Sequence, residues 1–330
     1  MRSEILKRLL QSHAERDEQG FRKAALQLAA NESSAGHTRV AAELREIIAQ
    51  LPTGARQSET TIDIAQPRGE LAGLLVGGHR EERLKDIILP PESRGKLERI
   101  LRENRARADL QSWGVSPSRR LLFYGPPGCG KTLAASVLAG ELGVPMMTVR
   151  FDGLFSRFLG ATAGHLKVIF DEMPRRPAVY LFDEFDAIAK SRGDAQEVGE
   201  IRRVVTSFLQ LMDADTSGSV IIAATNYEEL LDHAVFRRFD GLLRFALPNR
   251  TEIVELLRLR LKAFRLPARL LTQLAGNAEG LSFADLSRAS DDAIRSMILA
   301  GRRELLPADL KESFDHAIHR NEQVTSYKAS

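Results

Sequence analysis

Eight consecutive residues, Gly125 to Thr132 (GPPGCGKT), have the types and spacing needed to hold the phosphates of a nucleotide. They match G-x-x-x-x-G-K-[ST], follow an apolar run at 121–124 and precede a run of good helix formers. Glycines let backbone N–H groups curl around a phosphate without a Cβ clash, and the following helix N-terminus adds partial positive charge. We expect Lys131 to reach the β- and γ-phosphates and the Thr132 hydroxyl to ligate Mg²⁺. The residues expected to bind nucleotide are Pro127, Gly128, Cys129, Gly130, Lys131, Thr132, Leu133 and Asp183.

Two adjacent carboxylates, Asp183 and Glu184, follow the apolar run at 178–182. Ligands bind at the carboxyl ends of strands in parallel α/β sheets, so a strand here would deliver both side chains to the nucleotide. One carboxylate, Asp183, can hold Mg²⁺ through a water molecule, and Glu184 can polarise the attacking water. The expected metal ligands are therefore Thr132 and Asp183.

Short β-like runs alternate with helical stretches in the middle of the chain, which is typical of a parallel α/β sheet. After Pro248 the pattern becomes entirely helical, over 251–264, 268–275, 283–300 and 307–320. The fold expected is a five-stranded parallel sheet between helices, with a C-terminal helical lid. The candidate strands are 120–125, 146–151, 178–183, 219–226 and 242–248.

The N-terminal part has a different composition. Residues 1–51 lack proline and contain apolar residues at helical spacing, and 52–70 is polar with two prolines. We predict a small N-terminal helical adaptor domain plus linker at 1–66, a large α/β subdomain at 67–248 and a helical lid at 249–330.

Composition excludes several classes of protein. The 43% hydrophobic residues suit a globular core, and 47 basic minus 44 acidic residues gives only +3, which disfavours a nucleic-acid partner. The single cysteine, Cys129, excludes a disulfide scaffold, and no apolar run is long enough to span a bilayer. We expect a soluble, cytoplasmic protein without a membrane partner.

From about Leu84 to Pro248 the chain resembles the ATPase module of the AAA family. The strings at 200–213 (EIRRVVTSFLQLMD) and 220–240 (VIIAATNYEELLDHAVFRRFD) are similar to the unfolding and severing branch, which includes katanin, spastin and the ESCRT-disassembly ATPases. The resemblance implies ATP and Mg²⁺ as ligands, a catalytic Glu184, and an Asn226 that positions the hydrolytic water. It also implies that Arg237 and Arg238 are arginine fingers. Such fingers act on the neighbouring subunit's nucleotide, so a homo-oligomer is expected, by analogy a hexameric ring.

A further part of the resemblance is Phe158-Leu159-Gly160, which matches the pore loop of AAA unfoldases. Apolar side chains displayed around a channel could grip a polypeptide of any sequence by non-directional burial. The alternative is that Phe158 packs in a local core. Among the departures from the family pattern, Phe283 replaces a lid glycine, which could alter packing against the adenine, and LKDIILPP (84–91) replaces the Asp-Ile-Gly-Gly motif.

Three functions compete. The first is a protein remodeller that threads polypeptide through a ring, with a separate protease as partner, similar to the ATPases of bacterial ATPase–subtilisin-like protease pairs in phage defence. The second is a DNA-associated loader, which the basic stretch at 94–107 favours slightly. The third is a nucleotide-dependent scaffold or switch. Two weaker signals are the spacing of His316 and His319, for which a solvated helix face is the simpler interpretation, and Cys129 as a redox-sensitive brake.

Overall fold

The computed structural model describes residues 25, 28 and 40 and the ranges 71–150, 160–185, 195–227 and 233–329, without the side chains of 160, 161, 195–203, 233, 234 and 324–329. The chain divides into two units, Met1–Ile64 and Ala65–Ser330, and nearly all of the described residues belong to the second. The predicted N-terminal domain and linker lie almost entirely outside the described residues, and the adaptor domain and the boundaries at residues 66 and 248 stay predictions.

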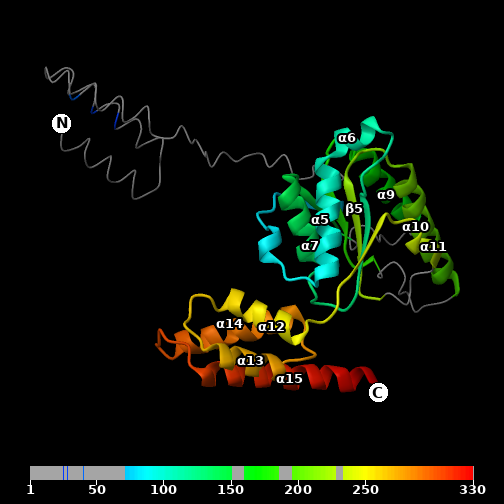
Figure 1. Ribbon diagram of the computed structural model, residues 1–330. Coiled ribbons are helices and arrows are strands. Elements are labelled where there is room, and N and C mark those ends of the chain that lie inside the picture. Colours follow the sequence, from blue (N-terminus) through cyan, green and yellow to red (C-terminus); the bar gives the residue numbers. More distant parts are fainter. Residues whose placement is uncertain are drawn as a thin grey trace. The chain divides into compact units, whose positions relative to one another are not determined.

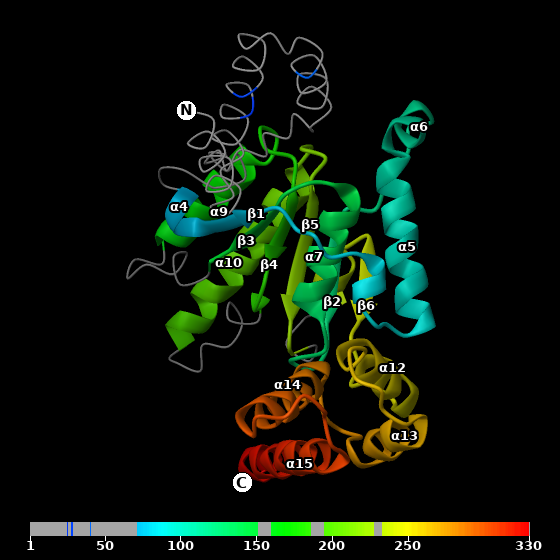
Figure 2. The same ribbon diagram turned by 90° about the vertical axis from the view of Figure 1, so that its left-hand side faces the viewer.

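A six-stranded sheet forms the centre of the second unit (Figures 1 and 2), in the order β1-β3-β4-β5-β2-β6. All neighbouring strands are parallel except β1, which pairs antiparallel with β3, Leu75 opposite Val149. The five predicted parallel strands are confirmed. The strands are β1 (Leu75–Gly78), β2 (Arg120–Tyr124), β3 (Met146–Val149), β4 (Val179–Phe182), β5 (Val220–Thr225) and β6 (Gly241–Arg244).

The prediction of five strands was one too few, because β1 gives almost no sequence signal. Its four residues, Leu-Val-Gly-Gly, include two glycines, which are depleted in strands, and it directly follows the short helix α4 (Leu71–Leu74). The strand is stabilised by its partner rather than by its own propensity, since its backbone pairs with the edge of β3 over four residues.

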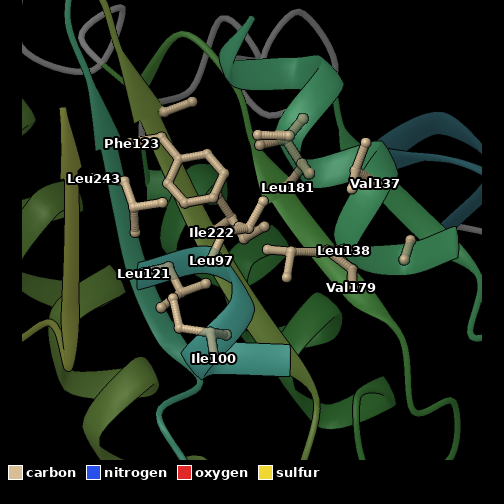
Figure 3. Packing of buried hydrophobic residues seen from close by; sticks show 14 of the residues in the cluster. Leu97, Ile100, Leu121, Phe123, Val137, Leu138, Val179, Leu181, Ile222 and Leu243 are labelled. Atoms are coloured by element: carbon tan, nitrogen blue, oxygen red, sulfur yellow. The ribbon is translucent and has the colours of Figure 1, made fainter. Parts of the chain in front are cut away.

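Helices cover both faces of the sheet because successive strand residues point to opposite sides. On one face α5 (Pro91–Arg105) and α7 (Lys131–Leu142) pack on a buried cluster that includes Leu121, Phe123, Val179, Leu181 and Ile222 (Figure 3). On the other, α9 (Gly160–Glu172) and α10 (Ala195–Ala214) pack on a cluster that includes Leu122, Tyr180, Phe182, Ile221 and Ala223. The short elements are η1 (Leu84–Asp86), α6 (Arg107–Ser112) and α11 (His233–Phe236).

The predicted helical lid is present as four helices with a core of their own. Side-chain caps define the starts of two of them: Asn249 accepts hydrogen bonds from Thr251 and Glu252, and Ser282 accepts one from Asp285. None of the helices within the described ranges is long and apolar enough to cross a membrane. The lid helices are α12 (Arg250–Arg260), α13 (Ala268–Asn277), α14 (Phe283–Leu299) and α15 (Pro307–Ala329).

A glycine in α7 permits close packing of the segment that precedes α5. A Cβ at Gly140 would lie 2.2 Å from the backbone oxygen of Glu82, so Gly140→Ala requires a backbone shift. We expect the substitution to lower the free energy of unfolding by about 1–3 kcal/mol, the usual cost of overpacking. Urea unfolding measures this.

The matched control is Gly95→Ala in α5, where a Cβ meets nothing within 4 Å. Alanine is the better helix former, so this variant should be unchanged or more stable by up to about 1 kcal/mol. Equal effects of the two substitutions would contradict a packing role for Gly140.

Candidate nucleotide-binding site

The loop between β2 and α7, here called the phosphate loop (Gly125–Thr132), depends on backbone conformations that favour glycine. Its three glycines all have positive φ: 133° at Gly125, 74° at Gly128 and 96° at Gly130. At Gly125 space is limiting as well, since a Cβ would lie 1.9 Å from the backbone oxygen of Phe245. The backbone of the loop therefore packs closely against Phe245, which follows β6, and the loop leads directly into the first turn of α7.

Lys131 begins α7, and its side chain turns back into the loop. The residue is only 6% exposed, and Nζ donates to the backbone oxygens of Gly125 at 2.7 Å and Pro126 at 2.9 Å. The ammonium group is thus held inside the curve of the phosphate loop. A cation in that position can bind the phosphates of a nucleotide.

Thr132 and Asp183, predicted from separate motifs, are in direct contact. The Thr132 hydroxyl donates to the Asp183 carboxylate, Oγ1 to Oδ2, at 2.7 Å. The next residue, Glu184, is exposed and has φ 54°, the one positive φ at a non-glycine among the residues described. Its N–H donates to the other oxygen of Asp183 at 2.9 Å. A non-glycine residue held in this region costs free energy and is typical of functional sites.

Asn226 is placed beside these groups by the strand order. It follows β5, which lies between β4 and β2. The carboxyl ends of β2, β4 and β5 therefore carry the phosphate loop, the acidic pair and Asn226 side by side. The half-buried Asn226 sits in a local turn, in which the Tyr227 N–H donates to the Thr225 hydroxyl at 3.1 Å.

Arg237 and Arg238 lie at the amino ends of the strands, opposite to the phosphate loop, just before β6 begins. The carboxylate of Asp240, in the same turn, accepts the backbone N–H groups of Arg119 and Arg120 at the start of β2. Because β2 has five residues at about 3.3 Å each, its two ends are separated by roughly 16 Å. The two arginines are therefore far from the phosphate loop of their own chain.

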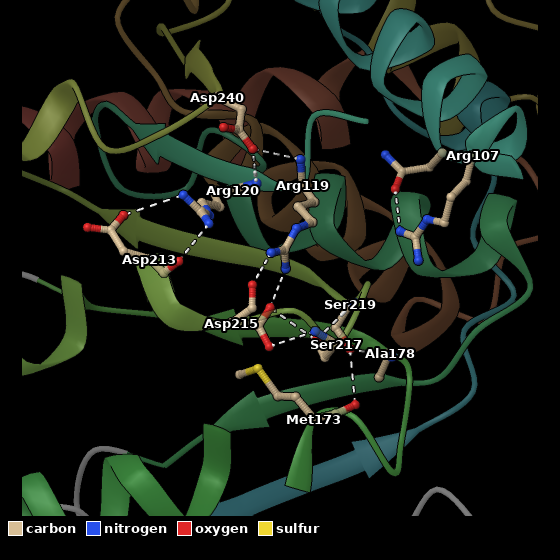
Figure 4. Close-up of polar contacts among 11 residues, drawn as sticks. Arg107, Arg119, Arg120, Met173, Ala178, Asp213, Asp215, Ser217, Ser219 and Asp240 are labelled. Atoms are coloured by element: carbon tan, nitrogen blue, oxygen red, sulfur yellow. Dashed lines mark hydrogen bonds and ion pairs between the residues drawn. The ribbon is translucent and has the colours of Figure 1, made fainter. Parts of the chain in front are cut away.

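The two arginines differ in their contacts. Arg238 forms an ion pair with Asp213, which also pairs with Arg120 at 3.4 Å, whereas Arg237 is exposed and has no partner in the part of the chain that the structure describes. Figure 4 shows Asp213 and Asp240 on either side of Arg120, and Arg119 bound to the buried Asp215. Asp213 and Asp240 were not predicted as site residues, although they end the strings at 200–213 and 220–240 that carry the family resemblance.

The lid reaches the phosphate loop through the first turn of α14. The Ala284 N–H donates to the backbone oxygen of Gly128 at 3.1 Å, and a Cβ at Gly128 would lie 2.5 Å from the Ser282 hydroxyl oxygen. The side chain of Phe283 is half-buried and packs on the lid core instead of standing free beside the loop. Its helical position in the first turn of α14 explains this orientation.

The segment that replaces the Asp-Ile-Gly-Gly motif joins the two cores. Ile87 packs in the α5/α7 cluster, with its Cδ1 4.0 Å from where a Cβ of Gly130 would be, and the adjacent Ile88 packs in the lid cluster. The segment thus links the sheet, the phosphate loop and the lid.

Other predicted site residues are placed only in part. Phe158 and Leu159 lie outside the described residues, and Gly160 begins α9. Cys129 is buried, and burial raises the pKa of its thiol above the ordinary value, which keeps it protonated and unreactive at neutral pH. Within the described ranges no group of three or more metal-ligating side chains is found, and His319 contacts Glu322 and Gln323 on the exposed face of its own helix.

Comparison with known proteins identifies the family. Residues 121–247 match the family described as "ATPase family associated with various cellular activities (AAA)". The chain is 35% identical over 324 residues to the uncharacterised AAA family ATPase y4kL of Sinorhizobium fredii, covering 97% of this chain and 96% of that protein. It is 33% identical to the ATP-dependent zinc metalloprotease FtsH 3 of Sphaerobacter thermophilus, over 72% of this chain and 50% of that one. It is also 33% identical to the proteasome-activating nucleotidase of Thermococcus onnurineus, over 70% and 62%.

Proposed function

The chain belongs to the AAA family of ATPases and hydrolyses ATP, and we propose that it uses this energy to remodel other proteins as an oligomeric ring. The contact that carries the proposal for the site is the 2.7 Å hydrogen bond between Thr132 and Asp183. It brings a hydroxyl and a carboxylate, both hard oxygen ligands, together at the mouth of the phosphate loop. Mg²⁺ prefers such ligands.

In the proposed site each residue has a distinct task. Lys131 binds the β- and γ-phosphates from within the loop, and Thr132 and Asp183 hold Mg²⁺, which neutralises phosphate charge when bound. Glu184 takes a proton from the attacking water, and the Asn226 amide orients that water. The fit rests on the residues themselves: a buried cation, an oxygen pair in contact and an exposed carboxylate lie at one edge of the sheet.

The proposed ring follows from the place of the arginines. Arg237 is exposed, permanently charged and roughly a strand length of 16 Å from its own phosphate loop. If Arg237 stabilises the transition state, it must therefore act on the nucleotide of a second copy. We infer a head-to-tail homo-oligomer, and a closed hexamer by analogy with the family.

The proposed cargo is a polypeptide. Phe158, Leu159 and Gly160 would form the gripping loop, and residues 1–66 would recruit substrate or a partner. Relatives named as a zinc metalloprotease and as a proteasome-activating nucleotidase support a link to proteolysis. The peptidase would be a separate protein here, and a role beside a subtilisin-like protease in phage defence is the specific form of this proposal.

A DNA partner is disfavoured by the way the basic stretch is arranged. On α5 the predicted apolar face is buried, with Ile100 and Leu101 at 4% and 1% exposure. Three basic residues of the helix pair with acidic ones along it: Arg94 with Glu98 at 3.2 Å, Lys96 with Glu92 at 2.8 Å and Arg99 with Glu103 at 2.7 Å. These pairs lower the positive charge available to a phosphate backbone.

The proposal is tested with Glu184→Gln protein, which should hold ATP without turning it over. Fluorescein-labelled denatured casein is the polypeptide probe, and its binding is followed by anisotropy with ATP or ADP. We expect casein to bind with ATP and not with ADP. We expect Phe158→Ala in the same background to weaken casein binding at least about tenfold, since each buried aromatic contributes roughly 1.5–3 kcal/mol.

The control is ATPase activity of Phe158→Ala in the otherwise native chain, which should stay near the parent value. Single-stranded DNA is the second probe. Binding of DNA but not casein, or casein binding that is indifferent to Phe158, would overturn the threading function.

A further inference from the structure

The turn that carries the exposed Arg237 has little regular structure of its own. This segment, here called the Arg237 turn (residues 237–240), follows α11, which has only four residues, and leads into β6. A single helical turn is marginally stable by itself, because forming it fixes several residues in return for few hydrogen bonds. Arg237 and Asp240 are exposed, whereas Phe239 is buried in the core below α9 and α10. The conformation of the turn therefore depends on contacts with other parts of the chain.

Asp240 joins the Arg237 turn to the start of β2 by three hydrogen bonds. Its backbone N–H donates to the backbone oxygen of Arg120 at 2.8 Å. Its carboxylate accepts the backbone N–H groups of Arg119 at 3.0 Å and of Arg120 at 2.9 Å (Figure 4). Both N–H groups reach the same carboxylate oxygen, Oδ2. The main chain and the side chain of one residue thus fasten the turn to a strand inside the sheet.

The Asp240 carboxylate acts here as a hydrogen-bond acceptor and not as the partner of a cation. Among the residues that the structure describes, it forms no ion pair, and its second oxygen accepts no hydrogen bond. The side chains of Arg119 and Arg120 pair instead with Asp215 and Asp213. The contacts that Asp240 makes could therefore also be made by a neutral amide oxygen.

We propose that Asp240 is a positioning residue for Arg237, because its hydrogen bonds to β2 fix the turn from which the guanidinium reaches the nucleotide of the neighbouring copy. The inference rests on the proposed function, since it requires Arg237 to act as an arginine finger. Asp240 follows Arg237 by only three residues, so loss of its hydrogen bonds frees the backbone beside the finger. A displacement of about 1 Å in a group that contacts the transition state can lower a rate about 100-fold.

The test compares phosphate release at saturating ATP by Asp240→Ala and Asp240→Asn. We expect Asp240→Ala to lower the rate at least about tenfold, because the finger is no longer held in place. Asp240→Asn should stay within about threefold of the parent, because its one amide oxygen can accept both N–H groups, as Oδ2 does.

The ATP dissociation constant, measured in the Glu184→Gln background, should change less than about twofold in both variants. The reason is that Asp240 contacts the start of β2, whereas the phosphate loop follows the end of that strand.

Two further measurements separate positioning from a general effect on the fold. In the Arg237→Ala background, Asp240→Ala should cause no additional loss of hydrolysis, because a residue that acts only through Arg237 then has nothing to position. Asp240→Ala subunits mixed with Glu184→Gln subunits should regain hydrolysis, because each variant leaves intact the side of the interface that the other lacks.

The matched control is Asp309→Ala, which removes a carboxylate that also accepts a backbone N–H, from Leu306 at 3.0 Å, but in the lid. Urea unfolding should show a less stable protein, while phosphate release by Asp309→Ala stays near the parent rate.

Parental turnover by Asp240→Ala, or a loss that adds to that of Arg237→Ala, overturns the inference. Should Asp240→Ala fail to fold, Asp240→Glu keeps the charge but moves it by one methylene group, and it should be less active than Asp240→Asn. The reverse order overturns the inference, because charge would then matter more than the placed acceptor. Parental turnover by Arg237→Ala is a different result, since it contradicts the finger in the proposed function itself.

Discussion

The Glu184→Gln variant is expected to hydrolyse ATP at least about 100-fold more slowly than the parent, which is the usual contribution of a positioned general base. An amide has nearly the same shape as a carboxylate but cannot accept the proton of the attacking water. The effect should be confined to chemistry. Glu184 is exposed and its contact with Asp183 is made by the backbone N–H, so the substitution leaves that hydrogen bond in place.

The measurement is steady-state phosphate release at saturating ATP, together with the ATP dissociation constant, which should stay within about twofold because general-base catalysis acts on the transition state. Glu279→Gln provides a control for removal of an exposed negative charge from the lid, and it should hydrolyse ATP normally. Turnover by Glu184→Gln within about threefold of the parent would remove Glu184 from the catalytic role and direct attention to another base near Asp183.

The parts of the fold that could be predicted are those specified by local sequence. The five parallel strands contribute residues to the clusters on both faces of the sheet and appear as short apolar runs, because helices cover both sides. The phosphate loop is specified by glycines that local backbone geometry requires, as at Gly125. Thr132 and Asp183 were both predicted at the carboxyl ends of strands, and the structure shows that they meet although β5 lies between β4 and β2.

What could not be predicted depends on contacts between distant residues. Strand β1 exists because β3 has a free edge, and its own sequence carries two glycines. Phe283 was identified only as a substitution in a motif that could alter packing against the adenine, and the motif does not indicate where its side chain packs. Its orientation is set by the lid core on which it packs.

The different contacts of Arg237 and Arg238 also could not be predicted from the sequence. The string AVFRRFD does not distinguish the two arginines. Only the folded chain shows that Asp213, 25 residues earlier, pairs with Arg238. Arg238 thus helps to fix the turn at the amino end of the sheet, and Arg237 remains available to a neighbour. No periodicity or motif spacing carries that information.

The Arg237→Ala variant gives the most direct test of the proposed ring. We expect ATP hydrolysis to fall about 1,000-fold, the scale of an arginine finger, while ATP binding stays near the parent value because Arg237 lies far from the phosphate loop of its own chain. If the finger acts on the neighbour, Arg237→Ala and Glu184→Gln damage different sides of the same interface. Mixing the two inactive proteins must then create some interfaces in which both residues are intact.

In an equal, random mixture the site is intact on half of the subunits and the finger on half of their neighbours, so about one quarter of interfaces are complete. Phosphate release should therefore rise from near zero for either variant alone to a substantial fraction of the parent rate, with a maximum near equal proportions. An Arg237→Ala/Glu184→Gln double variant mixed with Glu184→Gln is the matched control and should stay inactive, because every site then lacks Glu184. Activity that fails to return in the first mixture, in samples shown by mass photometry to exchange subunits, would place Arg237 outside the neighbour's site and remove the main support for the ring.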